Sequence, residues 1–284
     1  MEQKNSRRGM LLMLLCAVMW SISGLLIKMT TWHSIAVSGG RSFFAALVMA
    51  AYMKCARIPF VLSRKSIGGA VSLTCVFILF VYATKLTSSA NAIVLQDSAP
   101  IFVLLYNLIF RKTRVRALDF VTIALAFSGI LLFFMDQLSA GGLTGNILAV
   151  LAGIAFAANM IQQSECTQAE GMSGILLGHV ATFLIGLPFM FLYDTPFTSE
   201  NLTAIVLLGV VQLGIPYVLY AVAAHQCSPL AISLIGMAEA VFNPIWVALA
   251  YGEIPGLISL VGAVILLGAT AFWMTRSLPS GRKT

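Results

Sequence analysis

Four ionisable side chains lie deep within apolar stretches of this sequence: Arg41, Asp97, His179 and Glu239. A charged group in a lipid bilayer costs about 3 kcal/mol or more, so it normally faces a cavity or a partner. A carboxylate removed from water holds a proton readily and can exchange it for a cation. Glu239 is the residue that we expect to bind substrate or couple to protons.

Glu239 belongs to a polar and aromatic stripe. Gly236, Glu239, Asn243, Trp246 and Ala250 follow one another at spacings of three and four, which places them on one helical face. Trp246 can offer a π surface while Glu239 and Asn243 orient hydrogen bonds, as a polar ligand requires. The alternative is a face that packs against another helix through polar contacts.

The four ionisable groups suggest two pairs. Arg41 and Asp97 lie at similar depth in their stretches, so they could form an ion pair. His179 aligns with Arg41 in the second half of the chain, so a contact between His179 and Glu239 is the symmetric expectation. One pair would be structural and the other would bind substrate or protons, or both would be structural, because a buried pair alone is weak evidence for function.

Gln96 is the cavity residue that we expect from the stretch containing Asp97. At an offset of 140 residues Asp97 aligns with Met237 rather than Glu239. Residues two positions apart lie about 200° from each other around a helix. The face that matches the Glu239 stripe then begins at Gln96. Asp97 is expected to pair instead.

The first and sixth apolar stretches carry matching faces. At an offset of 136, Trp20 and Ser23 lie over Phe156 and Asn159, and Gln163 continues the second face. The two aromatic rings could hold a planar or cationic ligand between them while the polar groups form hydrogen bonds with it. Simple packing between helices is the alternative.

The composition indicates a protein that lies in a membrane. Of 284 residues, 60% are hydrophobic and 10% are charged, whereas soluble domains carry about 25% charged residues. Helices of about 20 apolar residues cross the hydrocarbon core of a bilayer. Such stretches run near residues 9–27, 34–53, 67–84, 89–110, 118–135, 143–163, 173–193, 202–224, 229–251 and 256–275. The sequence predicts an all-α integral membrane protein with ten transmembrane helices.

The chain also repeats itself. Residues 81–90 align with residues 221–230 at an offset of 140, which indicates five-helix repeats over 1–140 and 141–284 within one membrane domain. With five helices in each, the second repeat enters the membrane from the opposite side, and substrate belongs near the midplane between the inverted halves. Four prolines are expected to interrupt helices, namely Pro100, Pro188, Pro216 and Pro244.

Positive charges predict the orientation. If the N-terminus is cytoplasmic, fourteen of the 17 Lys and Arg residues lie in cytoplasmic gaps and tails, and only Lys28 and Lys85 lie in gaps on the other side. Positive residues in short loops resist translocation. We expect both termini in the cytoplasm, a bacterial-type inner membrane, and a monomer, because ten helices in one chain can enclose a cavity.

Several segments carry a family resemblance: Ala-Val-Met-Trp at residues 17–20, Arg41, residues 91–102, Met-Ala-Glu at residues 237–239 and residues 249–253. In these the chain resembles the drug/metabolite transporter superfamily, in its EamA-like branch with ten spans. Members typically have Glu-Pro where this chain has Glu239 followed by alanine. The resemblance implies an exporter or exchanger of metabolites, amino-acid-like compounds or xenobiotics, with a central cavity.

We therefore expect a secondary transporter that exports or exchanges a small polar or cationic substrate, with protons as the coupling ion. A uniporter, or a carrier of a lipid-like substrate, is the alternative. An intramembrane enzyme is disfavoured because the chain lacks HExxH and GxSxG motifs and paired aspartates in a GxGD setting. A receptor would need larger loops. The five cysteines form no metal-binding spacing, and we expect no metal, cofactor or nucleic-acid partner.

Overall fold

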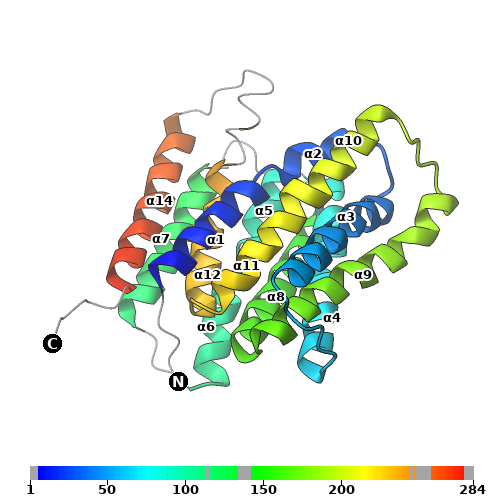
Figure 1. Ribbon diagram of the computed structural model, residues 1–284. Coiled ribbons are helices and arrows are strands. Elements are labelled where there is room, and N and C mark those ends of the chain that lie inside the picture. The colour runs from blue at the N-terminus through cyan, green and yellow to red at the C-terminus, as the bar shows by residue number, and fades with distance from the viewer. Residues whose placement is uncertain are drawn as a thin grey trace.

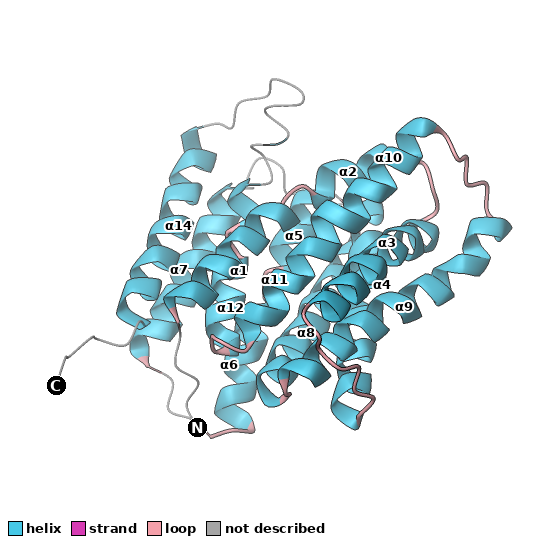
Figure 2. Ribbon diagram, in the orientation of Figure 1, coloured by secondary structure: helices cyan, strands magenta, loops and turns pink. Residues whose placement is uncertain are grey.

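The computed structural model is a single bundle of helices (Figure 1). It describes residues 6–87, 89–112, 116–133, 142–242, 246 and 257–277, and these ranges contain no strand (Figure 2). The prediction of an all-α fold is confirmed for them. The elements are α1 (Arg7–Trp20), α2 (Ser23–Met29), α3 (Ser34–Cys55), α4 (Arg64–Leu86), α5 (Ser89–Gln96), α6 (Ala99–Ile109), α7 (Ala117–Phe133), α8 (Leu143–Glu165), α9 (Gln168–Leu192), α10 (Ser199–Leu207), a π-helical segment η1 (Leu208–Gly214), α11 (Ile215–Ala224), α12 (Pro229–Gly236) and α14 (Leu257–Ser277).

Six helical stretches are long and apolar enough to cross a membrane. They are Arg7–Met29, Ser34–Cys55, Arg64–Leu86, Leu143–Glu165, Gln168–Leu192 and Ser199–Ala224. Four shorter apolar helices accompany them, at Ala99–Ile109, Ala117–Leu132, Pro229–Phe242 and Val264–Arg276. Large apolar side chains such as Leu11, Leu47 and Leu184 are exposed on the outer faces of the bundle, as contact with lipid requires. The ten-span count stays a prediction.

Three of the predicted spans contain a break. The first changes direction at Ser21 and Ile22, between α1 and α2, and the fourth at Asp97 and Ser98, between α5 and α6. In the ninth predicted span α12 ends before a turn at residues 237–238, and one further helical turn covers residues 239–242. The breaks at 97–98 and 237–238 are 140 residues apart, which is the offset of the sequence repeat.

Pro216 accounts for a different irregularity. Proline lacks the N–H that would bond to the carbonyl of Gln212, four residues earlier. The chain before it widens into η1, where the N–H of Ile215 bonds to the carbonyl of Val210 instead. The predicted interruption at Pro188 is wrong, because α9 continues through this residue. Pro244 lies outside the described residues.

Close glycine contacts hold the long helices together. A Cβ atom on Gly186 of α9 would lie 2.6 Å from the Cα atom of Gly39 in α3. A Cβ atom on Gly129 of α7 would lie 2.8 Å from the carbonyl oxygen of Gly262 in α14. These helix pairs therefore approach backbone to backbone, a packing that small residues permit in membranes.

Candidate functional site

Two adjoining cavities lie inside the bundle, and both are lined by Trp20, Phe156 and Glu239. We call the first the Arg41 cavity; its wall also contains Val76, Phe77, Phe80, Gln96, Gln212, Leu213, Tyr217 and Arg41 itself. We call the second the Asp97 cavity; its wall also contains Ala99, Pro100, Met160, Ser233, Gly236 and Asp97 itself. Each has room for only a few water molecules. The helices are thus closed around this central site.

The breaks in the helices bring the acidic groups to the central site. Gln96 is the last residue of α5 and lines the Arg41 cavity, whereas Asp97 lies at the break itself and lines the Asp97 cavity. The sequence predicts Gln96 as the cavity residue and Asp97 as a member of an ion pair. Because the helix is interrupted here, neighbouring side chains reach both cavities.

Glu239 stands between the two cavities. It lies in the helical turn that follows the break at residues 237–238 and is 5% exposed. The hydroxyl of Ser23, the first residue of α2, donates a long hydrogen bond of 3.5 Å to its Oε1 atom. This contact joins the break in the first span to the break in the ninth.

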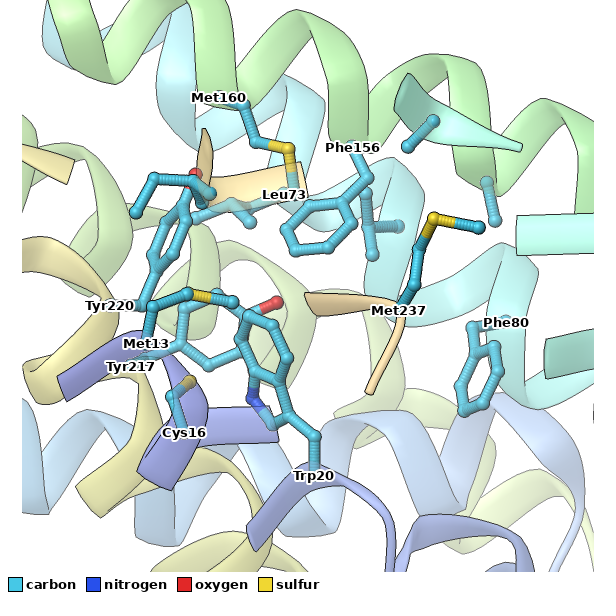
Figure 3. Close-up of a cluster of buried hydrophobic side chains, with 14 of the residues drawn as sticks. Met13, Cys16, Trp20, Leu73, Phe80, Phe156, Met160, Tyr217, Tyr220 and Met237 are labelled. Atoms are coloured by element: carbon cyan, nitrogen blue, oxygen red, sulfur yellow. The ribbon is translucent and has the colours of Figure 1, made fainter. Parts of the chain in front are cut away.

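Aromatic rings form much of the wall. The Trp20 ring centroid lies 5.5 Å from that of Phe156, 5.3 Å from that of Tyr217 and 5.8 Å from that of Tyr220. Figure 3 shows these four side chains side by side, although they come from α1, α8 and α11. The Trp20 indole nitrogen has no hydrogen-bond partner within the described residues. The two rings predicted to hold a ligand are in edge contact in this closed arrangement.

The predicted ion pair between Arg41 and Asp97 is wrong. The Arg41 guanidinium donates to the side-chain oxygen of Gln212 at 3.4 Å and to the carbonyl oxygen of Phe77 at 3.1 Å. Both ion pairs found among the described residues lie elsewhere, at helix ends. Arg41 lines one cavity and Asp97 the other, so equal depth did not bring them to the same side of the bundle.

The predicted contact between His179 and Glu239 is also wrong. His179 is fully buried in α9, where its ring stacks on Phe77 with centroids 4.5 Å apart and planes 7° apart. Tyr217 meets the same ring edge-on at 5.4 Å. His179 lines neither cavity, so it supports the aromatic wall from behind.

Asn159 and Gln163 take part in helix packing rather than in the cavity walls. The Asn159 amide donates to the carbonyl of Gly69 at 3.3 Å and to the hydroxyl of Ser72 at 3.2 Å, and its oxygen accepts from Tyr220 at 2.8 Å. The Gln163 amide donates to a backbone carbonyl at the start of α9. Their predicted face is therefore split, with Phe156 at the cavities and these two amides elsewhere.

Trp246 reaches the first predicted span. Its indole N–H donates to the hydroxyl of Ser21 at 2.7 Å, so it binds the break between α1 and α2. Asn243 lies outside the described residues. In the described part of the chain no three His, Cys, Asp or Glu residues gather to hold a metal ion.

Comparison with known proteins identifies the family. The pattern of the EamA-like transporter family matches residues 7–135 and again residues 143–275. The chain belongs to the EamA-like transporter family. The predicted resemblance to the drug/metabolite transporter superfamily is thereby confirmed. As a member of this family, the protein is a multi-pass membrane transporter of small molecules, and members of the family are transporters rather than enzymes.

The fold of this EamA-like transporter also resembles a solved structure. The similarity extends over 95% of this chain and 97% of the other, which is described only as "Crystal structure of protein", with a TM-score of 0.79 and 14% sequence identity. At that identity the likeness concerns the fold alone. Among proteins with curated descriptions, none matches this transporter.

Phe77, Gln212 and Tyr217 are among the cavity residues of this transporter that sequence reasoning missed. Gln212 had a usable signal, because a carboxamide within an apolar run also needs a partner in a membrane. Tyr217 follows Pro216 directly, and a polar aromatic residue beside a helix interruption was a second usable signal.

Side-chain contacts link the two repeats at both ends of the transporter. At the end where α4 and α9 begin, the Ser63 hydroxyl donates to Glu170 at 2.8 Å, and Arg111 forms an ion pair with Glu165. At the opposite end, the backbone N–H of Thr31 donates to the side-chain oxygen of Asn201 at 3.1 Å. Each contact joins residues from different family repeats.

Proposed function

We propose that this transporter exchanges protons for a small polar or cationic substrate at the central site, by alternating access. The observation that carries the proposal is a pair of buried carboxylates beside breaks that recur in both repeats. Asp97 is 8% exposed and Glu239 5%. Neither has a Lys, Arg or His nitrogen within 4.0 Å in the part of the chain that the structure describes.

An unpaired carboxylate in a dry interior is costly, and binding a proton or a cation removes that cost. In this mechanism a proton reaches Glu239 from outside and the cationic substrate leaves. On the cytoplasmic side a new substrate binds and the proton is released. Each net charge that crosses gains or loses about 2.3 kcal/mol per 100 mV of membrane potential.

The architecture that fits this mechanism has ten spans in two inverted repeats. The first repeat begins beside the loop after α11, where the Ser6 hydroxyl donates to Gln226. The second repeat begins beside the C-terminal end of α4, where a Cβ atom on Gly145 would lie 2.9 Å from Thr87. Opposite starting points support inversion, and α1 begins on the side where α14 ends (Figure 1).

The membrane setting follows from the charge distribution. Fourteen Lys and Arg residues on one side against two on the other favour cytoplasmic termini. We place the transporter in a bacterial-type inner membrane as a monomer, since both cavities are built from one chain. Rocking of the repeats would break the contacts between them at each end in turn and open the central site to one side at a time.

Proton-coupled flux in proteoliposomes tests this function. Liposomes that contain the purified transporter and an internal pH dye are given a panel of amines and amino acids, with and without a proton gradient. We expect at least one compound to move protons in wild type and in the exposed control Glu200→Gln, and not in Glu239→Gln. Substrate movement without proton movement would indicate a uniporter and overturn the coupling. Response to lipids alone would overturn the polar substrate.

A further inference from the structure

A short connection leads from α2 into α3 and lies against the chain that joins α9 to α10. The Trp32 indole N–H donates to the carbonyl oxygen of Pro196 at 2.9 Å, and the His33 ring stacks on that of Tyr193, with centroids 4.1 Å apart and planes 4° apart. These contacts join the two family repeats at the end that the proposed orientation places outside. We call them the outer seam, which comprises the contacts Thr31–Asn201, Trp32–Pro196 and His33–Tyr193.

His33 also caps α3 with its side chain. Its Nδ1 atom accepts a hydrogen bond from the backbone N–H of Ile35 at 3.4 Å, in the first turn of the helix. An acceptor at this position satisfies one of the N–H groups that a helix leaves without a partner at its start. Both ring nitrogens are donors in the protonated imidazole, so only the neutral ring can accept at Nδ1. The cap therefore requires an unprotonated His33.

The groups around His33 disfavour a positive charge on its ring. The N-terminal end of α3 carries a partial positive charge, and the ammonium group of Lys85 in α4 donates to the carbonyl oxygen of the preceding residue, Trp32, at 2.8 Å. The neighbouring rings of Tyr82 and Tyr193 are neutral, and an aromatic face attracts a cation only weakly where water has access. No carboxylate lies within 4.0 Å of His33 in the part of the chain that the structure describes. Burial and the charge of Lys85 hold the pKa of His33 below its ordinary value.

We propose that His33 makes the outer seam a pH-sensitive switch, in which the neutral ring holds the two repeats together and a proton from outside loosens the seam. Protonation removes the acceptor from the first turn of α3 and places a charge beside Lys85 and the helix N-terminus. When the seam opens, water reaches the ring and the penalty on its charged form disappears. The inference rests on the proposed alternating access, and it adds that external acid opens the end at which protons enter.

The direction of the pKa shift fixes the pH window. His33 has the lower pKa while the seam is intact, and a pKa near the ordinary value of about 6.5 once the seam is open. The open seam therefore binds the proton more tightly, and by linkage acid favours it. The intact seam is fully favoured above about pH 6.5, and it loses that preference as the pH falls below this value.

Hydrogen–deuterium exchange of the purified, full-length transporter tests the switch. The reporter is the backbone amide of Thr31, which is bonded to Asn201 across the seam. Between about pH 7.5 and about pH 5.5 we expect its exchange, divided by the intrinsic chemical rate, to rise about threefold or more, since one pKa unit changes a two-state ratio at most tenfold. Amides in the middle of α8 should keep their protection, which shows that the protein stays folded.

Two variants that do not titrate identify the group responsible. His33→Asn restores an acceptor that is preferred at the start of a helix, and His33→Phe keeps an aromatic ring beside Tyr193. We expect the pH response of the Thr31 amide to vanish in both, with protection retained at the higher pH. His225→Asn, the same substitution at the C-terminal end of α11, is the matched control and should keep the wild-type response.

Glu239→Gln separates the switch from proton coupling. This variant should keep the response at the outer seam while it loses proton-coupled flux. If it abolishes the response, protonation of the central site opens the seam, so the proposed function stands and the switch is rejected. If the response belongs to His33 but no compound moves protons, the switch stands and the coupling is rejected.

Three further results overturn the switch. The first is a wild type whose Thr31 amide shows no pH response beyond the chemical rate. The second is a response that persists in either His33 variant. The third is loss of Thr31 protection at the higher pH in both variants, which would make His33 a purely structural contact.

Discussion

The long helices α3, α4, α8 and α9 differ from the helices that break beside the central site. The long helices pack backbone against backbone, and Asn159 of α8 has bonded partners in both α4 and α11. The broken helices carry Gln96 and Asp97, each with a buried oxygen that has no partner among the described residues. A continuous framework thus holds the structure, while the unpaired buried carboxylate of Asp97 lies where a helix is interrupted.

The packing of glycine shows the same contrast. A Cβ atom on Gly186 in the framework would collide with the backbone of α3 at 2.6 Å, whereas one on Gly236, at the end of α12, would meet only the end of the Met13 side chain at 3.4 Å. The contact between α3 and α9 is therefore tight, whereas the end of α12 has slack. Slack is what a moving part requires, and four sets of substitutions test the contrast.

The largest effect is expected in the framework, from Gly186→Ala. The added methyl forces α3 and α9 apart, and overpacking of this kind costs about 1–3 kcal/mol or more. Gly236→Ala should cost much less, and Gly68→Ala, which meets nothing within 4 Å, should be neutral or stabilising. Apparent melting temperatures in detergent measure all three. Equal losses for Gly186 and Gly236 would remove the distinction between the two regions.

An exchange of amide and acid sharpens the contrast. Asn159→Asp replaces a bonded NH2 donor with an acceptor that faces other acceptors, so it should destabilise the transporter by about 1–3 kcal/mol. Asp97→Asn removes an unpaired buried acid, so it should leave the melting temperature unchanged or higher while proton-coupled flux falls. If Asp97→Asn destabilises as much as Asn159→Asp, the acid is structural.

A smaller effect is expected from Trp246→Phe. This change removes the 2.7 Å hydrogen bond to Ser21 and keeps an aromatic ring, so it should cost about 1 kcal/mol. Because the bond reaches the break between α1 and α2, flux should also change. Ser21→Ala serves as the partner variant. Additive effects of the two substitutions in the double variant would show that the bond contributes nothing.

The smallest effect is expected from Arg111→Gln. Its ion pair with Glu165 is partly exposed, with side chains 35% and 44% accessible, and such pairs contribute about 0.2–1 kcal/mol. The melting temperature should shift little, and the shift should shrink further in high salt. A loss as large as that of Gly186→Ala would mean that this end contact belongs to the framework.

The sequence supplied most of the fold and part of the site. Apolar length located the helices, and the cost of buried charge selected Glu239, which the structure places between both cavities. Repeat alignment placed Gln96 correctly on a cavity wall. Trp20 and Phe156 lie there too, although in direct contact with each other.

The errors have a physical cause. Depth along a helix says nothing about the direction in which a side chain points, so Arg41 and Asp97 were paired although they line different cavities. The alignment of Asn159 with Ser23 assumed that both helices were regular. However, α1 ends before Ser23, whereas α8 continues through Asn159. The π-helical segment that presents Gln212 arises beside Pro216 and changes the helical register, which periodicity alone does not predict.

The central claim is that Glu239 is the shared site of proton and substrate. Proton release on adding amines and amino acids to the purified transporter, in weak buffer and detergent, tests it most directly, because no membrane or gradient intervenes. We predict ligand-evoked acidification in wild type and in Glu200→Gln, and none in Glu239→Gln. If Glu239→Gln binds a ligand and still releases protons, Glu239 is not the coupling residue and the account is contradicted.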